Sequence, residues 1–464
     1  MTDASQTPHS APNESGFGRF LRATEIDPRL LGMIGALVLI ALAFEAYSTF
    51  VLGRPSLLLG AAQAEANGFI TPRNLWNLSV QTAYIGIMAT GMVLVIITRN
   101  IDLSVGSIMG VVGMYMGLMQ VHWLPDGLGL GLGHPAIWIV TALFGILVGA
   151  LIGALQGSMI AYLSIPSFIV TLGGLLVWRG MAFLVESGKT IAPLDENFAL
   201  IGGGSFGALG GTGSWIVAGI GCLVLVWAMI NSRKSRRHHG FPLRPMWAEY
   251  FVGGVICAAL LGATATVNAY IWPKGNIEKY YQAIGQDLPE CAKNNDTIYQ
   301  DVCGSFSHGY AYPVLILIAV AVFMTILMTR TRFGRYVFAI GGNPEAAALS
   351  GINTRAMTVK IFALMGALAG VAAVIGSARQ NSATNAMGNL DELYVIAAAV
   401  VGGTSLAGGV GTIYGAIIGA LILTALQTGM VLIGFGDGSY QRIVIGLALV
   451  LAVFLDILYR KRIK

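Results

Sequence analysis

Charged side chains are scarce in this sequence. Asp, Glu, Lys and Arg make up 11% of its 464 residues, whereas hydrophobic residues make up 55%. A soluble globular domain carries about 25% charged residues. Burial in a water-soluble core cannot explain this deficit over so long a chain. The composition therefore predicts a polytopic membrane protein, and the net charge of +5 calls for no nucleic-acid partner.

Cysteine is also rare, and no group of His and Cys has the spacing of a metal site. Cys222 and Cys257 fall inside apolar runs, where we expect them to be packing residues. Cys291 and Cys303 lie in a polar loop. They could form a disulfide if this loop faces an oxidising compartment, worth about 3 kcal/mol in the entropic model. The alternative is two free thiols.

Nucleotide-binding and catalytic motifs are missing as well. The tetrapeptide SGKT at 187–190 resembles part of a phosphate-binding loop, but Phe183 occupies the place of a required glycine. No pairing of a nucleophile with a base is visible in the sequence. We therefore expect neither an enzyme nor a chain that binds ATP itself, and we expect no metal or cofactor.

What the sequence has in abundance is long apolar runs. A membrane span needs about 20 mostly apolar residues. The fold class predicted is an all-α polytopic membrane protein with about twelve transmembrane or re-entrant helices. The runs lie at 30–50, 78–98, 103–120, 136–160, 167–186, 214–230, 250–272, 312–329, 358–377, 393–408, 412–432 and 440–458. The run at 393–408 is short and rich in Gly, so it either spans the membrane or forms a re-entrant helix.

The loops predict the topology. An even number of spans puts both termini on one side, and most Lys and Arg residues then fall on the side of the N-terminus. Basic loops face the cytoplasm, which favours an N-in, C-in arrangement. Residues 1–29 are polar and rich in Pro and Ser, so we expect a disordered cytosolic tail before a transmembrane domain at 30–464.

A short helix is predicted in the loop between two of the spans. Asn343 is a good N-cap, Pro344 suits the first helical position, and Glu345 is favourable in the first turn. Gly351 provides a natural stop after Ser350. The exposed face is expected to consist of small side chains: Ala346, Ala347 and Ala348. These residues either fit a groove on a partner protein or form a structural helix on the membrane surface.

This loop carries a resemblance to a known family. The residues that fit the family pattern are Gly334, Arg335, Ala339, Ile340, Gly341, Gly342, Asn343, Ala346, Ala347, Ser350, Gly351 and Ile352. IDLSVGSIMG at 101–110 and the Gly-rich segment at 395–422 fit as well. The chain resembles ABC-transporter permeases of the ribose/xylose sugar-importer family. It is most similar to the D-xylose branch, which also has extra spans and loops, here at 187–311.

The resemblance implies a function and its partners. It implies a homodimeric permease in the bacterial inner membrane, with ABC ATPase subunits inside and a periplasmic sugar-binding protein outside. The transported sugar would be D-xylose or another pentose, and ATP would bind to the partner ATPase. The segment 330–357 would be the cytosolic coupling segment, and the residues contacting the ATPase would be Asn343, Pro344, Glu345, Ala346, Ala347, Ser350 and Gly351.

Polar residues within or beside the apolar runs are candidates for the translocation path, because lipid penalises them. They are Asp102, Ser104, Arg379, Asn381, Asn385, Asn389, Thr404, Ser405 and Gln427. The competing interpretation is a set of internal salt bridges, such as Asp102 with Arg99 or Arg179 with Glu186.

Two other functions stay open at this point. An ion-coupled sugar or solute symporter would need a relay of ionisable groups, and Glu45, Asp102 and Glu392 form no obvious chain. A non-transporting membrane scaffold would not need polar groups at the depth of a pore.

Overall fold

The computed structural model describes residues 16–60, 67–285 and 306–463, and throughout these ranges the regular secondary structure is helical. Ten helical segments within them are long and apolar enough to cross a membrane. They are α2 (Pro28–Phe50), α3 (Pro72–Ile97), Val105–Leu128, α6 (Ala136–Tyr162), α7 (Ser167–Leu184), α9 (Gly210–His238), α10 (Met246–Asn268), α14 (Tyr312–Arg330), α17 (Thr354–Gln380) and α19 (Ile413–Leu432). The all-α polytopic fold class is confirmed.

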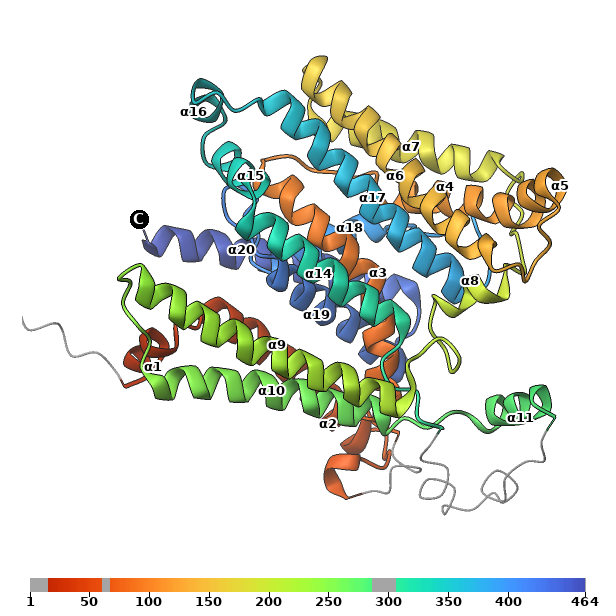
Figure 1. The fold of residues 1–464 in the computed structure, drawn as a ribbon, viewed down its shortest axis with the longest axis horizontal. Helices are drawn as coiled ribbons and strands as arrows, with labels where there is room; N and C mark the ends of the chain where they lie inside the picture. Colours follow the sequence, from red (N-terminus) through yellow and green to blue (C-terminus); the bar gives the residue numbers. More distant parts are fainter. Residues whose placement is uncertain (1–15, 61–66, 286–305, 464) are drawn as a thin grey trace, which may run out of the picture. The chain divides into compact units, whose positions relative to one another are not determined.

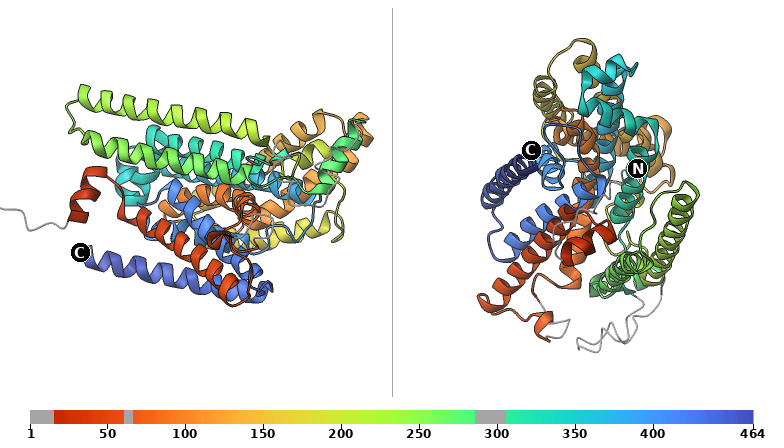
Figure 2. Two further views of the ribbon diagram at one scale, coloured as in Figure 1. Left: turned by 90° about the horizontal axis from the view of Figure 1, so that it is seen from below. Right: turned by 90° about the vertical axis from the view of Figure 1, so that its left-hand side faces the viewer.

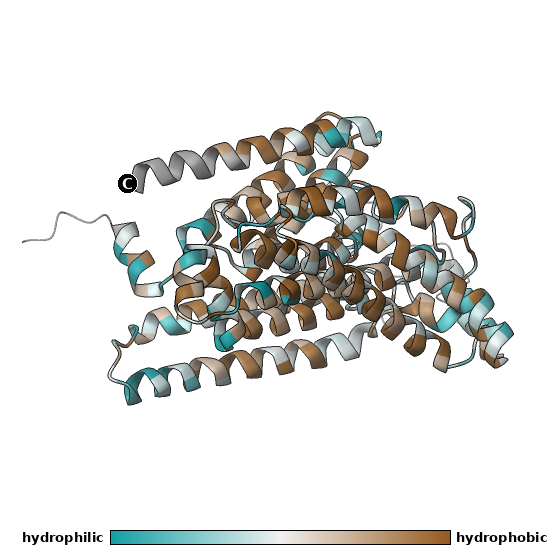
Figure 3. Ribbon diagram, turned by 90° about the horizontal axis from the view of Figure 1, so that it is seen from above, coloured by the Kyte–Doolittle hydropathy of each residue, from teal (hydrophilic) through white to brown (hydrophobic). Residues whose placement is uncertain are grey.

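Shorter elements connect or flank these helices. The segment Val105–Leu128 consists of α4 (Val105–Leu118), the π-helical turn η2 (Met119–Trp123) and α5 (Leu124–Leu128). The others are α1 (Gly16–Thr24), η1 (Leu57–Leu59), α8 (Glu196–Leu200), α11 (Lys274–Ala283), α15 (Arg332–Gly342), α16 (Pro344–Leu349) and α18 (Asp391–Val401). The last helix, α20 (Gly438–Ile463), has 26 residues, of which Gly438–Leu451 form a shorter apolar stretch. Hydrophobic residues run along the helices, and hydrophilic ones gather at many helix ends and loops (Figure 3).

The chain divides into two compact units. The first combines the described part of Met1–Gly32 with Trp215–Thr264, and the second comprises the described parts of Met33–Ser214 and Ala265–Lys464. A single transmembrane domain at 30–464 was predicted, so the division is a difference from the sequence interpretation. It arises because α9 and α10 pack mainly against one another, side by side as a hairpin (Figure 2).

The first unit also contains the N-terminal helix α1. Phe20 of α1 packs its ring against Phe251 of α10, with 5.4 Å between ring centroids. The prediction that residues 1–29 are disordered is wrong for residues 16–24, which form this helix. The apolar residues of α1 form one face that packs on α10. The polar composition of residues 1–29 as a whole does not show this face. Residues 1–15 lie outside the described residues.

Two helices form the centre of the second unit. Most residues of α3 and α17 are buried, and the two helices contact each other, while α17 also contacts α4. Figure 1 shows α17 running alongside α6 and near α3. Neither helix has a strongly polar face. This is expected, because a helix in the interior of a bundle is apolar on all sides.

Glycines allow α6 and α17 to approach closely. Gly149 and Gly153 are four residues apart on α6, so they lie on the same face. A Cβ atom on Gly149 would overlap the carbonyl oxygen of Gly366, and one on Gly153 would overlap that of Phe362. Small residues at this spacing let backbones pack tightly in lipid, where dispersion contacts drive helix association.

The region predicted as a weak span is a broken helix. Its helical part, α18, has 11 residues, which corresponds to about 16 Å at 1.5 Å per residue. The hydrocarbon core of a bilayer is about 30 Å thick, so α18 does not span it. Residues 381–390 before it and 402–412 after it are not helical. The segment that contains α18 runs from Asn381, beside the start of α3, to Gly409, whose backbone N–H donates to the carbonyl oxygen of Ile97 at the other end of α3. The run at 393–408 is therefore part of a broken helix and is neither a regular span nor re-entrant.

Candidate functional site

The short helix α16 is capped as predicted. Asn343 has an extended backbone, and its Oδ1 accepts hydrogen bonds of 3.0 Å from the backbone N–H groups of Glu345 and Ala346. Pro344 occupies the first helical turn. Gly351 follows the C-terminal Ser350 with φ +82°, a left-handed conformation that glycine adopts without strain. The local sequence therefore specifies both ends of this helix.

The exposed face of α16 differs from the prediction. Ala346 and Ala348 are exposed, but Ala347 is only 4% exposed and belongs to the main hydrophobic core. Leu349, which the sequence analysis did not single out, is 91% exposed. The prediction that Ala347 belongs to the exposed face of α16 is therefore wrong. The reason is that α16 packs one side against α15 and α17, and this packing decides which alanine points inward.

Arg99 ties the base of α16 to the central helix α3. Its Nε donates to the carbonyl oxygen of Gly341 at 3.0 Å and its Nη2 to that of Gly342 at 2.6 Å. These two residues end α15, directly before the N-cap of α16. The backbone N–H of Gly409 also donates to the carbonyl oxygen of Ile97. The end of α3, the start of α16 and the loop before α19 are thus joined in one place.

Asp102 and Ser104 form a buried polar group with Gln156. The Oγ of Ser104 lies 2.6 Å from Oδ1 of Asp102 and 2.9 Å from Oε1 of Gln156, and all three side chains are buried. Two polar atoms close by, Nε2 of Gln156 and Oε2 of Glu392, are buried without a hydrogen-bond partner in the described part of the chain. A Cβ atom on Gly106 would meet this Glu392 oxygen. Buried polar atoms without hydrogen bonds lower the stability of a protein, so their presence here makes this cluster a candidate for a functional role.

Arg179 holds the segment before α18. Its guanidinium donates to the backbone carbonyl oxygens of Asn385, Met387 and Gly388 at 2.9, 2.8 and 3.0 Å. The suggested salt bridges of Arg179 with Glu186 and of Arg99 with Asp102 do not form, since both arginines bind carbonyl oxygens instead. The chain leaves helical geometry at residues 381–390, and an arginine with several donors can satisfy the freed carbonyl groups.

Arg379 and Asn381 meet in a cavity at the other end of the bundle from α16. The cavity has a volume of about 370 Å³ and is also lined by Trp76, Asn77 and the backbone of Gly202–Gly204. Its wall combines the polar side chains of Asn77, Arg379 and Asn381 with apolar groups. The structure therefore brings together two candidate residues from the end of α17 with residues from the start of α3 and the loop after α8.

The other translocation-path candidates lie in the segments before and after α18, with one exception. Asn385 and Asn389 are in the segment before α18, and Thr404 and Ser405 are buried in the loop after it. Gln427 is half-buried on α19 and belongs to neither polar group. The disulfide candidates Cys291 and Cys303 lie outside the described residues, so their pairing stays a prediction.

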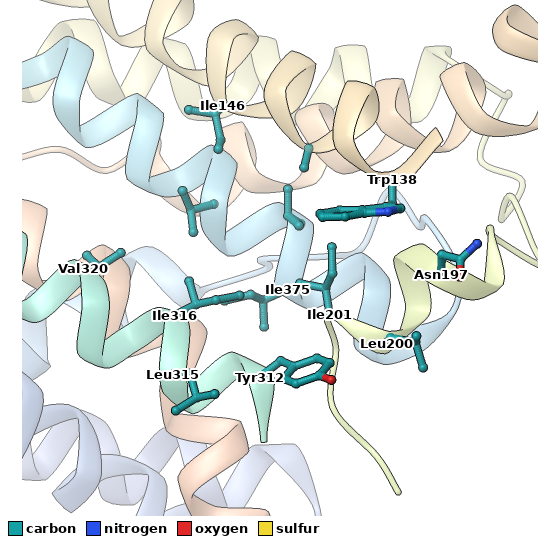
Figure 4. Close-up of a pocket in the computed structure, with 13 residues that line it drawn as sticks. Trp138, Ile146, Asn197, Leu200, Ile201, Tyr312, Leu315, Ile316, Val320 and Ile375 are labelled. Atoms are coloured by element: carbon teal, nitrogen blue, oxygen red, sulfur yellow. The ribbon is translucent and has the colours of Figure 1, made fainter. Parts of the chain in front are cut away.

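A second cavity, of about 620 Å³, has a different character. It lies between α6, α8, α14 and α17, and Figure 4 shows side chains such as Trp138, Ile146, Ile316 and Ile375 pointing into it. Almost its whole wall is apolar. A sugar needs hydrogen-bonding partners, so this cavity suits hydrocarbon and not a carbohydrate.

Comparison with known proteins identifies the family to which the chain belongs. Residues 74–453 match the family described as branched-chain amino acid transport system / permease component. The chain belongs to this family. It is 34% identical to the xylose transport system permease protein of Haemophilus influenzae over 399 residues, which is 86% of this chain and 92% of that protein.

Two further relatives come from Escherichia coli strain K12. The xylose transport system permease protein is 35% identical over 85% of this chain and 87% of its own length. The ribose import permease protein is 30% identical over 86% of this chain and 90% of its own length. No solved structure matches the chain. The chain is thus a multi-pass membrane transport subunit, as the resemblance in its loop 332–359 implied.

Sequence reasoning missed several residues of the site. Gln156 was not singled out, and Glu392 was named only as an ionisable residue without an evident neighbour. The two lie in helices far apart in the sequence, and only their packing shows that they approach Asp102. Asn77 and the glycine run 202–204 carry no motif. Arg179 was recognised as a charged residue inside an apolar run. Its partners could not be predicted, because they are backbone carbonyl groups, which every residue has.

Proposed function

We propose that this chain is the permease subunit of a binding-protein-dependent ABC importer that moves D-xylose or another pentose across the bacterial inner membrane. The observation that carries the proposal is α16, a capped helix with an exposed leucine, anchored at one end of a transmembrane bundle. The relatives named as xylose permeases support the choice of sugar.

The missing nucleotide-binding motif and the exposed coupling segment indicate which partners the chain would need. Its sequence has no nucleotide-binding motif, so ATP would be bound by separate ATPase subunits on the cytosolic side. These would dock on the exposed residues of the coupling segment 330–357. A second copy of the permease would complete the pathway, and a periplasmic sugar-binding protein would deliver the sugar. The N-in, C-in topology places α16 in the cytosol in this arrangement.

Arg99 offers a route for mechanical coupling. A displacement of α16 by the ATPase would act on Gly341 and Gly342, which Arg99 binds at the end of α3. The same junction holds Gly409 in the loop that follows α18. Movement of the coupling helix would therefore reach the central helix through the Arg99 side chain, and the backbone hydrogen bond between Gly409 and Ile97 would pass it on to the broken helix.

The translocation path would follow the broken helix. Polar candidates occur before it at Arg379 and Asn381, beside it at Asp102 and Ser104, and after it at Thr404 and Ser405. Non-helical backbone at membrane depth is tolerated where protein or a water-filled cavity covers it. Transporters use such broken helices to form substrate sites. In this structure Asp102 and Ser104 are buried, as expected for a closed state of the path.

Reconstitution tests the proposal against the alternative of an ion-coupled symporter. The permease is placed in vesicles with its ATPase, and uptake of labelled D-xylose is measured with and without ATP and binding protein. We expect uptake only when all components are present. Uptake driven by a proton or sodium gradient in the absence of ATPase would support the symporter instead. Lack of uptake of any pentose under both conditions would contradict the proposed substrate.

A further inference from the structure

Building on this proposed function, we propose that the 370 Å³ cavity lined by Arg379, Asn381, Asn77 and Gly202–Gly204 is a low-affinity monosaccharide site. It would receive the sugar at the outer mouth of the permease. The site lies within this chain and is distinct from the binding protein that delivers the sugar.

The position of the cavity fits an entrance. Asn77 is close to the start of α3, whereas the other end of α3 meets α15 and the base of α16. Asn77 is 20 residues before Ile97, the last residue of α3, so the two are about 30 Å apart at 1.5 Å per residue. That distance equals the hydrocarbon thickness of about 30 Å. The cavity is therefore at the membrane surface opposite the coupling helix.

The size and wall of the cavity match a monosaccharide. Small-molecule sites typically have volumes of about 300–1,000 Å³, and this one is near the lower limit. Its wall combines polar groups with the apolar surfaces of Trp76 and Val80. A pyranose has a comparable mixture, with hydroxyl groups around its edge and C–H groups on its faces. The other cavity in Figure 4 lacks the polar component.

Several polar groups of the wall are available to a ligand. Among the described residues, neither the guanidinium of Arg379 nor the side-chain amide of Asn77 has a hydrogen-bonded partner. Asn381 uses its Oδ1 to accept from the backbone N–H of Leu194 at 3.1 Å, which leaves its NH₂ group free to donate. Together these side chains offer donors and an acceptor to sugar hydroxyl groups.

The glycine run keeps the cavity open. Gly203 and Gly204 have φ values of +93° and +90°, which favour glycine. A Cβ atom on Gly202 would overlap the backbone of Arg379, so this contact needs a glycine. The loop can thus lie directly against the end of α17 without filling the space with side chains. Since the site is open to solvent, we expect weak binding, which a transport path requires for release.

Protection of an introduced cysteine tests the site directly, without the ATPase or the binding protein. Asn77→Cys permease loses the Asn77 amide but keeps Arg379 and Asn381 to bind the sugar. Labelling of position 77 by an impermeant thiol reagent is followed by mass spectrometry while D-xylose is titrated. At about ten times the Kd only about one site in eleven is free, so labelling should slow about tenfold. Arg73→Cys is the matched control, because Arg73 is exposed on the same helix outside the cavity.

The expected result is saturable protection of Cys at position 77 by D-xylose, with no protection at position 73 and none by glycine betaine. Adding Arg379→Ala should weaken the protection, measured as the ratio of the labelling rates of this double variant with and without sugar. Absence of protection up to the solubility limit, or equal protection by glycine betaine, would overturn the inference. If wild-type permease then still imports pentose with its partners, the proposed function stands and only the site is wrong.

Discussion

Leu349 provides the sharpest test of how α16 acts. Its side chain is 91% exposed, although leucine is among the residues most often buried. It lies at the end of the capped helix, next to the small exposed residues Ala346 and Ala348. This arrangement fits a leucine that inserts into a pocket of the ATPase while the alanines allow close approach. Leu349→Ala removes the side chain without disturbing the permease itself.

The magnitude follows from burial. Transferring an exposed leucine side chain into an apolar site contributes about 1.5–3 kcal/mol. Losing about 2 kcal/mol weakens binding about 30-fold, since each 1.4 kcal/mol corresponds to a factor of ten. The stability of the isolated permease should change by no more than about 0.5 kcal/mol, as is usual for exposed positions. The effect should therefore appear in association and not in folding.

The assay measures the Kd of purified ATPase for the permease in detergent, together with the thermal denaturation midpoint of the permease. Leu243→Ala serves as a control with the same chemical change, because Leu243 is exposed in the loop between α9 and α10. A Kd unchanged by Leu349→Ala, or changed equally by Leu243→Ala, would refute the idea that Leu349 anchors the ATPase.

Ala347 should behave in the opposite way. Because it is buried, Ala347→Arg overfills the contact between α16 and the core, which typically costs about 1–3 kcal/mol before the penalty for a buried charge. We expect a lower denaturation midpoint and reduced abundance of the permease. A normal midpoint combined with selective loss of ATPase binding would show that Ala347 faces the partner after all.

Further predictions concern packing, electrostatics and topology. Gly149→Val should lower the denaturation midpoint, since its side chain would overlap the backbone of α17. Arg179→Gln removes three hydrogen bonds from a charged donor and should cost at least about 3 kcal/mol, seen as a lower midpoint in detergent. Two arginines bind Glu25 and lower the pKa of its carboxyl group to about 2, so their stabilising effect is complete above pH 4.5 and is lost as the pH falls toward 2. Hydrogen exchange in α1 should show this loss in the wild type, whereas Glu25→Gln should show no such change with pH. A cysteine introduced at Ser235 should resist an impermeant reagent in intact cells if the basic segment is cytosolic.

The glutamate at position 25 illustrates a local effect that the sequence did not show. Its carboxylate binds Arg236 at 2.8 Å and Arg244 at 2.5 Å, and both arginines are more than 200 residues away in the chain. All three side chains are partly exposed, so solvent screens the attraction and the net contribution is small. The pairing adds to the aromatic packing of Phe20 on Phe251 that holds the N-terminal segment against the α9–α10 hairpin. The order of this segment depends on which residues are close in space, and the composition of the segment does not show that.

The sequence by itself determined the membrane class, the place of nearly every long helix and the caps of α16. These properties depend on local chemistry: a bilayer fixes the length of an apolar run, and Asn343 and Gly351 satisfy the ends of a helix from adjacent positions. Tertiary structure alone decided that Ala347 points inward, that Arg179 holds carbonyl groups of residues 385–388, and that α18 is too short to span. It also brought Asn77 to Arg379, residues separated by most of the chain. Such outcomes depend on which distant segments pack together, and no local pattern of residues encodes that.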